Sequence, residues 1–405
     1  MSESKKKNYI ILALLIMALI VLLFFANYTF AKNSPGGTDF LYRWLPTRLV
    51  FFKGYENPYS DEIEYQVELV HHGHAHQEDE TPGIFAYPYY TMAVFLPFAF
   101  TENFLLARTA WMTLMELAHI AIILISLKIT EYKPTKSILI ALIFFSLFSA
   151  EFLQALVDGN PSSLAALFAV LSLFSIKKKS DRWAGIFLAL STIKPQLVIL
   201  FFILIWLWAF FKKRWEIISS SLITLAILFG TSFILQPSWL AEFFKDVTTY
   251  TGVASPSTPR AILNYWMPAS SANIIAWGLT IFSIFVLYKI WKPSFNKGFS
   301  ALFWASSFTF VIMPFTGITS AKSNYIAMIP AVILLLQYAN EKLNKNDTLL
   351  SAFLWLWIFL SWLFFYAGRN WVLGENLIYF VDFYPLPILL LTLYLFMGRS
   401  APLRT

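Results

Sequence analysis

Residues 9–30 read YIILALLIMALIVLLFFANYTF, an unbroken apolar run that decides the fold class of this chain. A helix needs about 20 apolar residues to cross the hydrocarbon core of a bilayer, and this run is long enough to do so. It is longer than the roughly 7–15 apolar residues of a signal peptide. We therefore expect residues 9–31 to form a first membrane span that is not cleaved.

The rest of the chain has the same character. Of the 405 residues, 58% are hydrophobic and 13% are charged, whereas a soluble domain carries about 25% charged residues. We predict an all-α polytopic membrane protein with about twelve transmembrane helices, in which residues 1–405 form a single integral membrane domain. The apolar segments lie near residues 9–31, 103–127, 137–153, 161–176, 183–194, 195–211, 215–235, 271–291, 298–315, 321–339, 348–366 and 379–398.

The distribution of positive charge predicts the orientation. Short loops on the cytoplasmic side of a membrane protein are rich in Lys and Arg. This rule places both termini in the cytoplasm and residues 32–102 and 236–270 in two long outer loops. Residues 84–100 are interrupted by Pro88 and Pro97, and a crossing there would turn the later basic loops outward. We therefore interpret this segment as re-entrant or interfacial.

Two amphipathic stretches in the first outer loop predict helices that lie along the membrane surface. They are TDFLYRWLPTRLVFFKG (38–54) and SDEIEYQVELVHHG (60–73). The first of them begins within GGTDFLYRW, where Asp39 follows two glycines shortly after the first span. A carboxylate at this position is a candidate general base. The alternative is a helix N-cap, a role for which Thr38 competes.

Lys194 is the clearest candidate among the basic residues. The helix WAGIFLALSTIK (183–194) would be only about 18 Å long in a hydrocarbon core of about 30 Å, and Pro195 ends it. The Lys194 ammonium should therefore lie below the outer surface, where it needs an anionic partner. A phosphate ligand fits this requirement, and so does an internal ion pair or a side chain that extends to the surface.

Two further outer cations could converge with Lys194 on one phosphate. Lys322 opens the segment KSNYIAMIP, and Arg260 lies in STPRAILNYW. A membrane protein meets such a phosphate on a polyprenyl-phosphate headgroup. For Arg260 the alternative is a solvated loop cation.

Other polar residues carry weaker signals. Glu151 and Asp158 lie in EFLQALVDGNPSSL, whose GNP should form a turn that leaves Asn160 near the start of a helix. Asp158 could equally be a turn or cap residue. Glu116 and His119 share one helix face and predict an internal hydrogen-bonded pair rather than a proton relay.

The segment HHGHAHQEDE (71–80) contains four histidines, His71, His72, His74 and His76. Its spacing does not match a fixed metal-ligand set, so we favour a solvated loop over a divalent metal site. We predict no cofactor. The chain has no cysteine, which excludes disulfides, thiolate metal ligands and a cysteine nucleophile. The net charge of +7 is spread over short loops and does not indicate nucleic-acid binding.

The order of the motifs resembles glycosyltransferase family 87. After one span come TDFLYRWLPTRLVFFKGYENPY, AYPYYTMAVFLPFAF, VDGNPSSLAALFAVLSL, DRWAGIFLALSTIKPQLVILFF and SNYIAMIP. The similarity extends over roughly residues 9–340, and it is most specific at Asp39-Phe40, at Gly54-x-x-Asn57-Pro58-Tyr59 and at Ile193-Lys194-Pro195.

This resemblance implies a GT-C fold and a polyprenyl-phosphate-mannose-dependent mannosyltransferase of the cell envelope and its glycolipid synthesis. It implies Asp39 as the catalytic base in the first outer loop and Lys194 as the cation for the donor phosphate. The acceptor would be a lipid or a glycan, attacked with inversion at the extracytoplasmic face of the plasma membrane. Candidate sugar or acceptor contacts are Tyr42, Asn57, Tyr59, Tyr87, Asp158, Asn160, Asn324 and Tyr325, although the tyrosines could simply anchor the membrane interface.

Two other functions remain open from the sequence. A transferase that resembles an undecaprenyl-diphosphate-glycan ligase would depend on outer Arg and His side chains rather than on Asp39. A secondary transporter would use ionisable residues in mid-span, for which Glu116 and His119 are the candidates, but no internal repeat supports it. A non-enzymatic scaffold is disfavoured by the outer cations.

Overall fold

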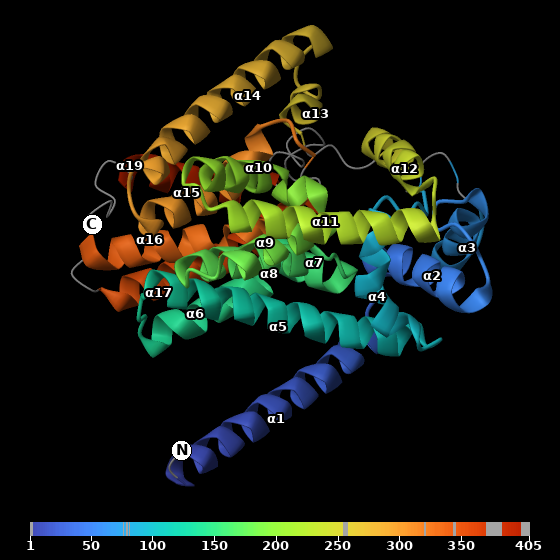
Figure 1. The fold of residues 1–405 in the computed structure, drawn as a ribbon, viewed down its shortest axis with the longest axis horizontal. Coiled ribbons are helices and arrows are strands. Elements are labelled where there is room, and N and C mark those ends of the chain that lie inside the picture. Colours follow the sequence, from blue (N-terminus) through green and yellow to red (C-terminus); the bar gives the residue numbers. More distant parts are fainter. Residues whose placement is uncertain are drawn as a thin grey trace. The chain divides into compact units, whose positions relative to one another are not determined.

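The computed structural model of the chain describes residues 3–75, 77, 80, 82–253, 258–319, 321–342, 346–369 and 383–397. Every regular element within these residues is an α-helix or a short 3-10 helix, as Figure 1 shows. This confirms the predicted all-α class. The chain divides into two compact units. The prediction of a single integral membrane domain stays a prediction.

The first unit comprises Met1–Phe85, Thr91–Leu117 and Leu156–Asn160. It holds the two helices that were expected to lie along the membrane surface. Its elements are α1 (Glu3–Asn33), α2 (Thr38–Lys53), α3 (Asp61–His71), α4 (Met92–Ala99) and the first half of α5 (Phe104–Thr130).

Helix α1 exposes most of its described apolar side chains, as a helix surrounded by lipid should. Its buried polar residue is Asn27, whose Nδ2 donates to Glu116 Oε2 over 2.7 Å and to Thr113 Oγ1 over 3.1 Å. Hydrogen bonds of this kind hold helices together where the surroundings offer no water. The contact fixes the end of α1 that leads into Asp39.

Helix α2 buries an aromatic face. The Phe40 ring stacks on Trp111 at a centroid distance of 5.3 Å, and Phe95 packs against Trp111 at 4.7 Å. The indole Nε1 of Trp111 donates to the Gly159 carbonyl over 2.7 Å. This hydrogen bond fixes the backbone at Gly159. The next residue, Asn160, is thereby held beside the start of α2.

The second unit comprises Ala86–Tyr90, Ala118–Ala155 and Pro161–Thr405. Its regular elements in the described residues are α6 (Lys136–Phe148), α7 (Ala150–Asp158, shared with the first unit), α8 (Ser162–Lys177), α9 (Asp181–Leu190), η2 (Ser191–Ile193), α10 (Pro195–Phe211), α11 (Trp215–Leu235), α12 (Trp239–Val253), α13 (Pro259–Leu263), α14 (Ala269–Trp291), η3 (Lys292–Phe295), α15 (Phe299–Ile312), η4 (Met313–Phe315), η5 (Lys322–Met328), α16 (Ile329–Lys342), α17 (Asp347–Arg369) and α19 (Pro385–Met397). The short helix η1 (Tyr89–Thr91) has residues in both units.

Helix α9 packs between α8 and α11 (Figure 1). A Cβ atom at Gly185 in α9 would fall on the Ser220 hydroxyl and the Ile217 carbonyl of α11. The absence of a side chain therefore allows the two backbones to approach closely. This packing positions the short helix that ends just before Lys194.

Five described helices are long and apolar enough to cross a membrane. A sixth candidate is the pair α6 and α7, which is bent by 52° at Ser149, so the span expected over 137–153 continues to Asp158. Several shorter apolar helices accompany them. A polytopic membrane protein is therefore supported, and the count of about twelve crossings stays a prediction.

The segment 84–100 forms only η1 and α4, which together cover Tyr89–Ala99. A helix of this length reaches roughly half of the thickness of a hydrocarbon core of about 30 Å. Pro97 lies inside α4. The short element accords with an interfacial or re-entrant segment, which stays a prediction.

Candidate active site

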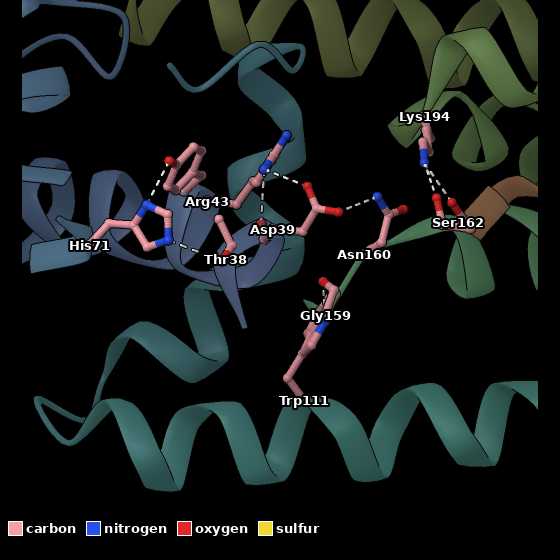
Figure 2. Close-up of polar contacts among 11 residues, drawn as sticks. Thr38, Asp39, Arg43, His71, Trp111, Gly159, Asn160, Ser162 and Lys194 are labelled. Atoms are coloured by element: carbon pink, nitrogen blue, oxygen red, sulfur yellow. Dashed lines mark hydrogen bonds and ion pairs between the residues drawn. The ribbon is translucent and has the colours of Figure 1, made fainter. Parts of the chain in front are cut away.

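Asp39 lies in the first turn of α2 and is held by two side chains (Figure 2). Arg43 Nη1 donates to Asp39 Oδ1 over 3.0 Å and also to the Asp39 carbonyl over 3.0 Å. Asn160 Nδ2 donates to Asp39 Oδ2 over 2.7 Å. The Asp39 side chain remains 27% exposed, whereas the side chain of Arg43 is 3% exposed. Each carboxylate oxygen has two lone pairs, so both can accept a further hydrogen bond.

The structure excludes the helix-cap alternative for Asp39. The N-cap of α2 is Gly37, and no side chain caps this helix. Thr38 is the first helical residue and not the N-cap, and its hydroxyl lies 3.3 Å from His71 Nε2. The Asp39 carboxylate therefore does not serve as the N-cap of α2.

The side chain of Arg108 packs against the backbone of the two glycines before Asp39 and leaves no room for a side chain at either position. A Cβ atom at Gly36 would lie 2.8 Å from Arg108 Nη2, and one at Gly37 would lie 2.8 Å from Arg108 Nε. Both glycines also have positive φ angles, 123° and 87°. The guanidinium donates to the Ser34 carbonyl over 3.0 Å and to the Val157 carbonyl over 3.3 Å. Arg108 thus fixes the turn that delivers Asp39.

His71, at the end of α3, contacts the side chains of α2. Its Nδ1 lies 3.0 Å from the Tyr42 hydroxyl and 3.0 Å from His72 Nε2. Partial burial lowers the pKa of His71, and the neighbouring His72 lowers this pKa further, against a smaller opposing effect of Glu80. Tyr42 is buried, and its role as a sugar contact stays a prediction.

Asn57 and Tyr59 form a turn that begins α3. Asn57 Oδ1 accepts from the Tyr59 backbone N–H over 3.1 Å, and Ser60 caps α3 by accepting from Ile63 N–H. The Tyr59 ring is buried and meets Phe85 edge-on at 5.6 Å. These contacts account structurally for the Asn-Pro-Tyr element, and its role as a sugar contact stays a prediction.

Lys194 is buried at the break that Pro195 was expected to cause. Helix α9 ends at Leu190, η2 follows, and Pro195 opens α10. Lys194 is 2% exposed, and its Nζ donates to Ser162 Oγ over 2.6 Å (Figure 2) and to Ser323 Oγ over 3.3 Å. Ser162 Oγ in turn donates to Asn324 Oδ1 over 3.0 Å. Three separate elements, the α9–α10 junction, α8 and η5, therefore meet at this ammonium.

The remaining predicted residues are less closely connected. Lys322 opens η5 next to Ser323, and its Nζ lies 5.7 Å from the ring centroids of Phe365 and Phe383. Tyr325 is buried and donates from its hydroxyl to the Phe383 carbonyl. Arg260 is exposed on α13, and its side chain makes no hydrogen bond or ion pair in the part of the chain that the structure describes.

Asp158 and Tyr87 differ in their exposure. Asp158 is exposed at the last residue of α7, and Tyr87 is buried just before η1. Both remain predicted contacts of a sugar or acceptor. His76 lies outside the described residues.

Glu116 and His119 do not form the predicted pair. Glu116 accepts from Asn27, whereas His119 Nδ1 donates to the Ser146 carbonyl over 2.6 Å and its Nε2 accepts from Ser163 Oγ over 2.8 Å. Residues three apart on a helix point about 60° from each other, so the two side chains meet different partners. His119 is fully buried and holds α6 and α8 to α5.

Within the described ranges, no three His, Cys, Asp or Glu side chains are arranged to hold a metal ion. His72 and His74 each lie 3.5 Å from Glu80 Oε1, which makes a local network in the loop. The sequence did not single out Arg43, Ser162 or Ser323 as site residues. The i to i+4 spacing of Asp39 and Arg43 could have revealed Arg43, but the serines carry no local signal.

A family model matches the central part of the chain. Residues 85–314, more than half of the chain, match the model of glycosyltransferase family 87. The matched range includes Asn160, Ser162 and Lys194, and Asp39 precedes it. No curated protein and no solved structure matches the chain. With its membrane-spanning helices and this match, the chain belongs to glycosyltransferase family 87 and is a membrane glycosyltransferase.

Proposed function

We propose that this protein transfers a hexose, specifically mannose, from a polyprenyl-phosphate donor to a lipid or glycan acceptor, with inversion at the anomeric carbon. The observation that carries the proposal is the setting of Asp39. Its carboxylate is oriented by Arg43 and Asn160, yet it remains partly exposed at the start of an outer-loop helix. A general base must combine a fixed position with access to its substrate.

The Asp39 carboxylate accepts the proton of the attacking hydroxyl. Arg43 and Asn160 each occupy one oxygen, and the remaining lone pairs can meet an acceptor hydroxyl. The two partners come from α2 and from the turn before α8. A base that is held in place in this way loses little orientational freedom when the acceptor binds.

Lys194 stabilises the departing phosphate. The oxygen that leaves the sugar develops negative charge, and a buried cation stabilises such charge more strongly than a solvated one. Hydroxyls from Ser162 and Ser323 hold the ammonium. The Ser162 hydroxyl already donates its one proton to Asn324, whereas the Ser323 hydroxyl can donate to a phosphate oxygen. Lys322, adjacent to Ser323, is the second cation of this proposal, and the exposed Arg260 is the third.

The residues that hold Asp39 and Lys194 are close together in the sequence. Asn160, which orients Asp39, and Ser162, which holds Lys194, are separated in the sequence by Pro161 alone. Consecutive Cα atoms are about 3.8 Å apart, so covalent geometry limits the distance between these two backbone positions. The residue that orients the proposed base and the residue that holds the proposed cation are therefore two positions apart along the chain.

The reaction follows from these roles. The acceptor oxygen forms a bond to C1 of the sugar while the bond from C1 to the phosphate oxygen breaks. The hydroxyl proton passes to Asp39, and the polyprenyl phosphate leaves with the electron pair of the broken bond. Asp39 then releases its proton to water. Attack opposite the leaving group inverts the configuration at C1.

The orientation is part of the proposal. The positive-inside rule places Asp39 in the first outer loop, at the extracytoplasmic face of the plasma membrane, with both termini in the cytoplasm. Polyprenyl-phosphate sugars and lipid or glycan acceptors meet at this surface. We propose no cofactor for the reaction, because the phosphate that leaves is already attached to the sugar.

Transfer of a labelled hexose by the purified protein in lipid nanodiscs tests the proposal. Mannosyl and glucosyl polyprenyl phosphates serve as donors, and envelope lipids serve as acceptors. We expect transfer by the wild type and a loss of roughly 100- to 10,000-fold in Asp39→Asn. Asp61→Asn, which removes another exposed outer-loop acid at a helix start, should retain activity. Equal transfer by Asp39→Asn and wild type would remove Asp39 as the base. Transfer only from diphosphate-linked glycans would support the ligase-type alternative.

A further inference from the structure

A basic cavity of about 510 Å³ lies in the second unit, at the end opposite to Ser162 along α8. We name it the basic cavity. Helices α8 and α10 end beside it, and α9, α11 and α15 begin beside it. It is lined by Ile176, Lys177, Lys179, Asp181, Trp208, Lys212, Arg214, Lys297, Gly298 and Phe299.

The charge of the lining is strongly positive. Asp181 is the one acid among the lining residues, and it is paired with Arg214, whose Nε donates to Asp181 Oδ2 over 2.9 Å. Lys177 donates to the Ile129 carbonyl and to Glu131 Oε1, each over 2.7 Å. In the described ranges, no hydrogen bond or ion pair from the side chains of the exposed Lys179, Lys212 and Lys297 is present. Like charges around one cavity repel each other, so an anion bound there is stabilised.

Three helix N-termini add to this positive potential, and the C-termini of α8 and α10 partly offset them. Asp181 and Phe299, the first residues of α9 and α15, line the cavity together with Arg214, the N-cap of α11. No side chain of an N-cap residue caps any of these three helices. Their first N–H groups and the positive ends of their dipoles favour an anion. Lys297 is informative because it precedes the N-terminus of α15, where the helix dipole disfavours a cation. The dipole therefore does not explain its position.

Two lysines in the turns beside the cavity occupy backbone positions that favour glycine. Lys179 and Lys213 have φ angles of 57° and 56°. They follow α8 and α10 in matching turns, in which Ser180 N–H donates to the Ser175 carbonyl and Arg214 N–H donates to the Ala209 carbonyl. Glycine is the usual residue at this position of a helix end. Lysine at both positions maintains positive charge at a cost in backbone energy.

The cavity also has an apolar wall. Trp208 is buried and lies under the Arg214 guanidinium at 5.2 Å, while Ile176 and Phe299 complete the apolar lining. Phe210, Phe211 and Trp215 are large exposed apolar side chains at the adjoining ends of α10 and α11. Aromatic side chains at helix ends mark the boundary between lipid and water. The ligand should therefore combine phosphate with an apolar part.

We propose that the basic cavity binds the phosphate headgroup of an anionic phospholipid from the inner leaflet. Basic pockets between transmembrane helices on the cytoplasmic side bind such headgroups. The assignment to the inner leaflet follows from the predicted orientation, whereas the binding site itself does not depend on the proposed transfer reaction. Bound lipid would connect the C-terminal ends of α8 and α10. The opposite end of α8 carries Ser162, and the opposite end of α10 follows Lys194.

The test compares the protein in nanodiscs of phosphatidylcholine alone and with phosphatidylglycerol or cardiolipin added. Thermal unfolding and lipid retention in native mass spectrometry are the readouts. The cavity variant combines Lys179→Gln, Lys212→Gln and Lys297→Gln. The control variant combines Lys133→Gln, Lys136→Gln and Lys342→Gln, which removes equal charge from exposed positions outside the cavity.

We expect anionic lipid to raise the unfolding temperature of the wild type and of the control variant. The apparent affinity of the cavity variant for anionic lipid should fall on the order of 100-fold. An equal loss in the control variant would overturn the proposal in favour of general attraction to the membrane surface. Absence of stabilisation in the wild type would also overturn it.

Two further arms keep the result decisive. Inorganic phosphate or ATP, added to phosphatidylcholine nanodiscs, should stabilise the wild type less than phosphatidylglycerol does. Equal stabilisation would identify a site for soluble anions and would overturn the lipid source. If the triple variant does not fold, the single variant Lys297→Gln against Lys342→Gln gives the same comparison, with an expected change of roughly fivefold.

Discussion

Asn160 donates a hydrogen bond from Nδ2 to Asp39 Oδ2 over 2.7 Å, although 121 residues separate the two in the sequence. Arg43 holds the other oxygen of the same carboxylate. The amide contributes no charge, so it orients the carboxylate without competing with Arg43 for the ion pair. The turn that carries Asn160 is itself fixed, because Trp111 donates to the carbonyl of Gly159.

Replacing Asn160 should reduce transfer by disturbing the orientation of Asp39. We expect Asn160→Ala to lower kcat roughly 10- to 100-fold, because one of two positioning hydrogen bonds is lost while the base remains. Asn160→Asp should lower kcat further, because a second carboxylate would face Asp39. Steady-state kinetics with a polyprenyl-phosphate sugar measures both. Unchanged kcat in both variants would contradict a positioning role for Asn160.

Replacing Gly37 should destabilise the protein more than replacing Gly54. Both residues have left-handed φ angles, 87° and 80°. A Cβ at Gly37 would contact Arg108 at 2.8 Å, whereas nothing lies within 4 Å of a Cβ at Gly54. We expect Gly54→Ala to cost about 1 kcal/mol from backbone strain and Gly37→Ala roughly 2–4 kcal/mol. Chemical unfolding in a mild detergent measures the difference, and equal costs would argue against the contact with Arg108.

Replacing Lys194 by methionine should abolish transfer without unfolding the protein. The two side chains have similar volumes, and Ser162 keeps Asn324 as a hydrogen-bond partner. We expect kcat to fall roughly 100-fold or more while the unfolding temperature stays equal or rises, because burial of the charge is no longer required.

The same variant distinguishes the two interpretations of Lys194. If Lys194 serves an internal ion pair, its removal leaves a buried charge and costs roughly 3–5 kcal/mol. Strong destabilisation of Lys194→Met, measured by thermal unfolding, would therefore favour the structural role. Ser175→Ala, which removes one buried hydroxyl elsewhere on α8, serves as a control for the general sensitivity of this helix.

Acidification should weaken the packing of α3 against α2 through His71. Its pKa lies below the ordinary value of 6.5, so the unfolded chain binds more protons as the pH falls below about 6.5, and the stability contributed by neutral His71 is lost. We expect the unfolding temperature to drop between pH 7.5 and 5.5, and to drop less in His71→Gln. His74→Gln is the matched control, because the contacts of His74 stay within the loop. An identical pH profile for wild type and His71→Gln would contradict this.

The sequence alone determined the class of the protein. Inside lipid, the N–H and C=O groups of a long apolar run can form hydrogen bonds only with the protein backbone. Helices therefore follow directly from composition. Local rules also predicted the break at Pro195 and the turn at Gly159, because proline and glycine act on their own backbone. An isolated acid and an isolated lysine near membrane boundaries marked Asp39 and Lys194 as unusual for the same local reason.

Only the tertiary structure decided which groups these residues meet. Ser162 and Ser323, the partners of Lys194, lie 32 and 129 residues away from it. Glu116 and His119 share one helix face, yet they bond to different helices. Sequence spacing encodes neighbours along one helix, but a contact between helices depends on how their side chains pack. The roles of Asn160 and of the lysines around the basic cavity follow from that packing.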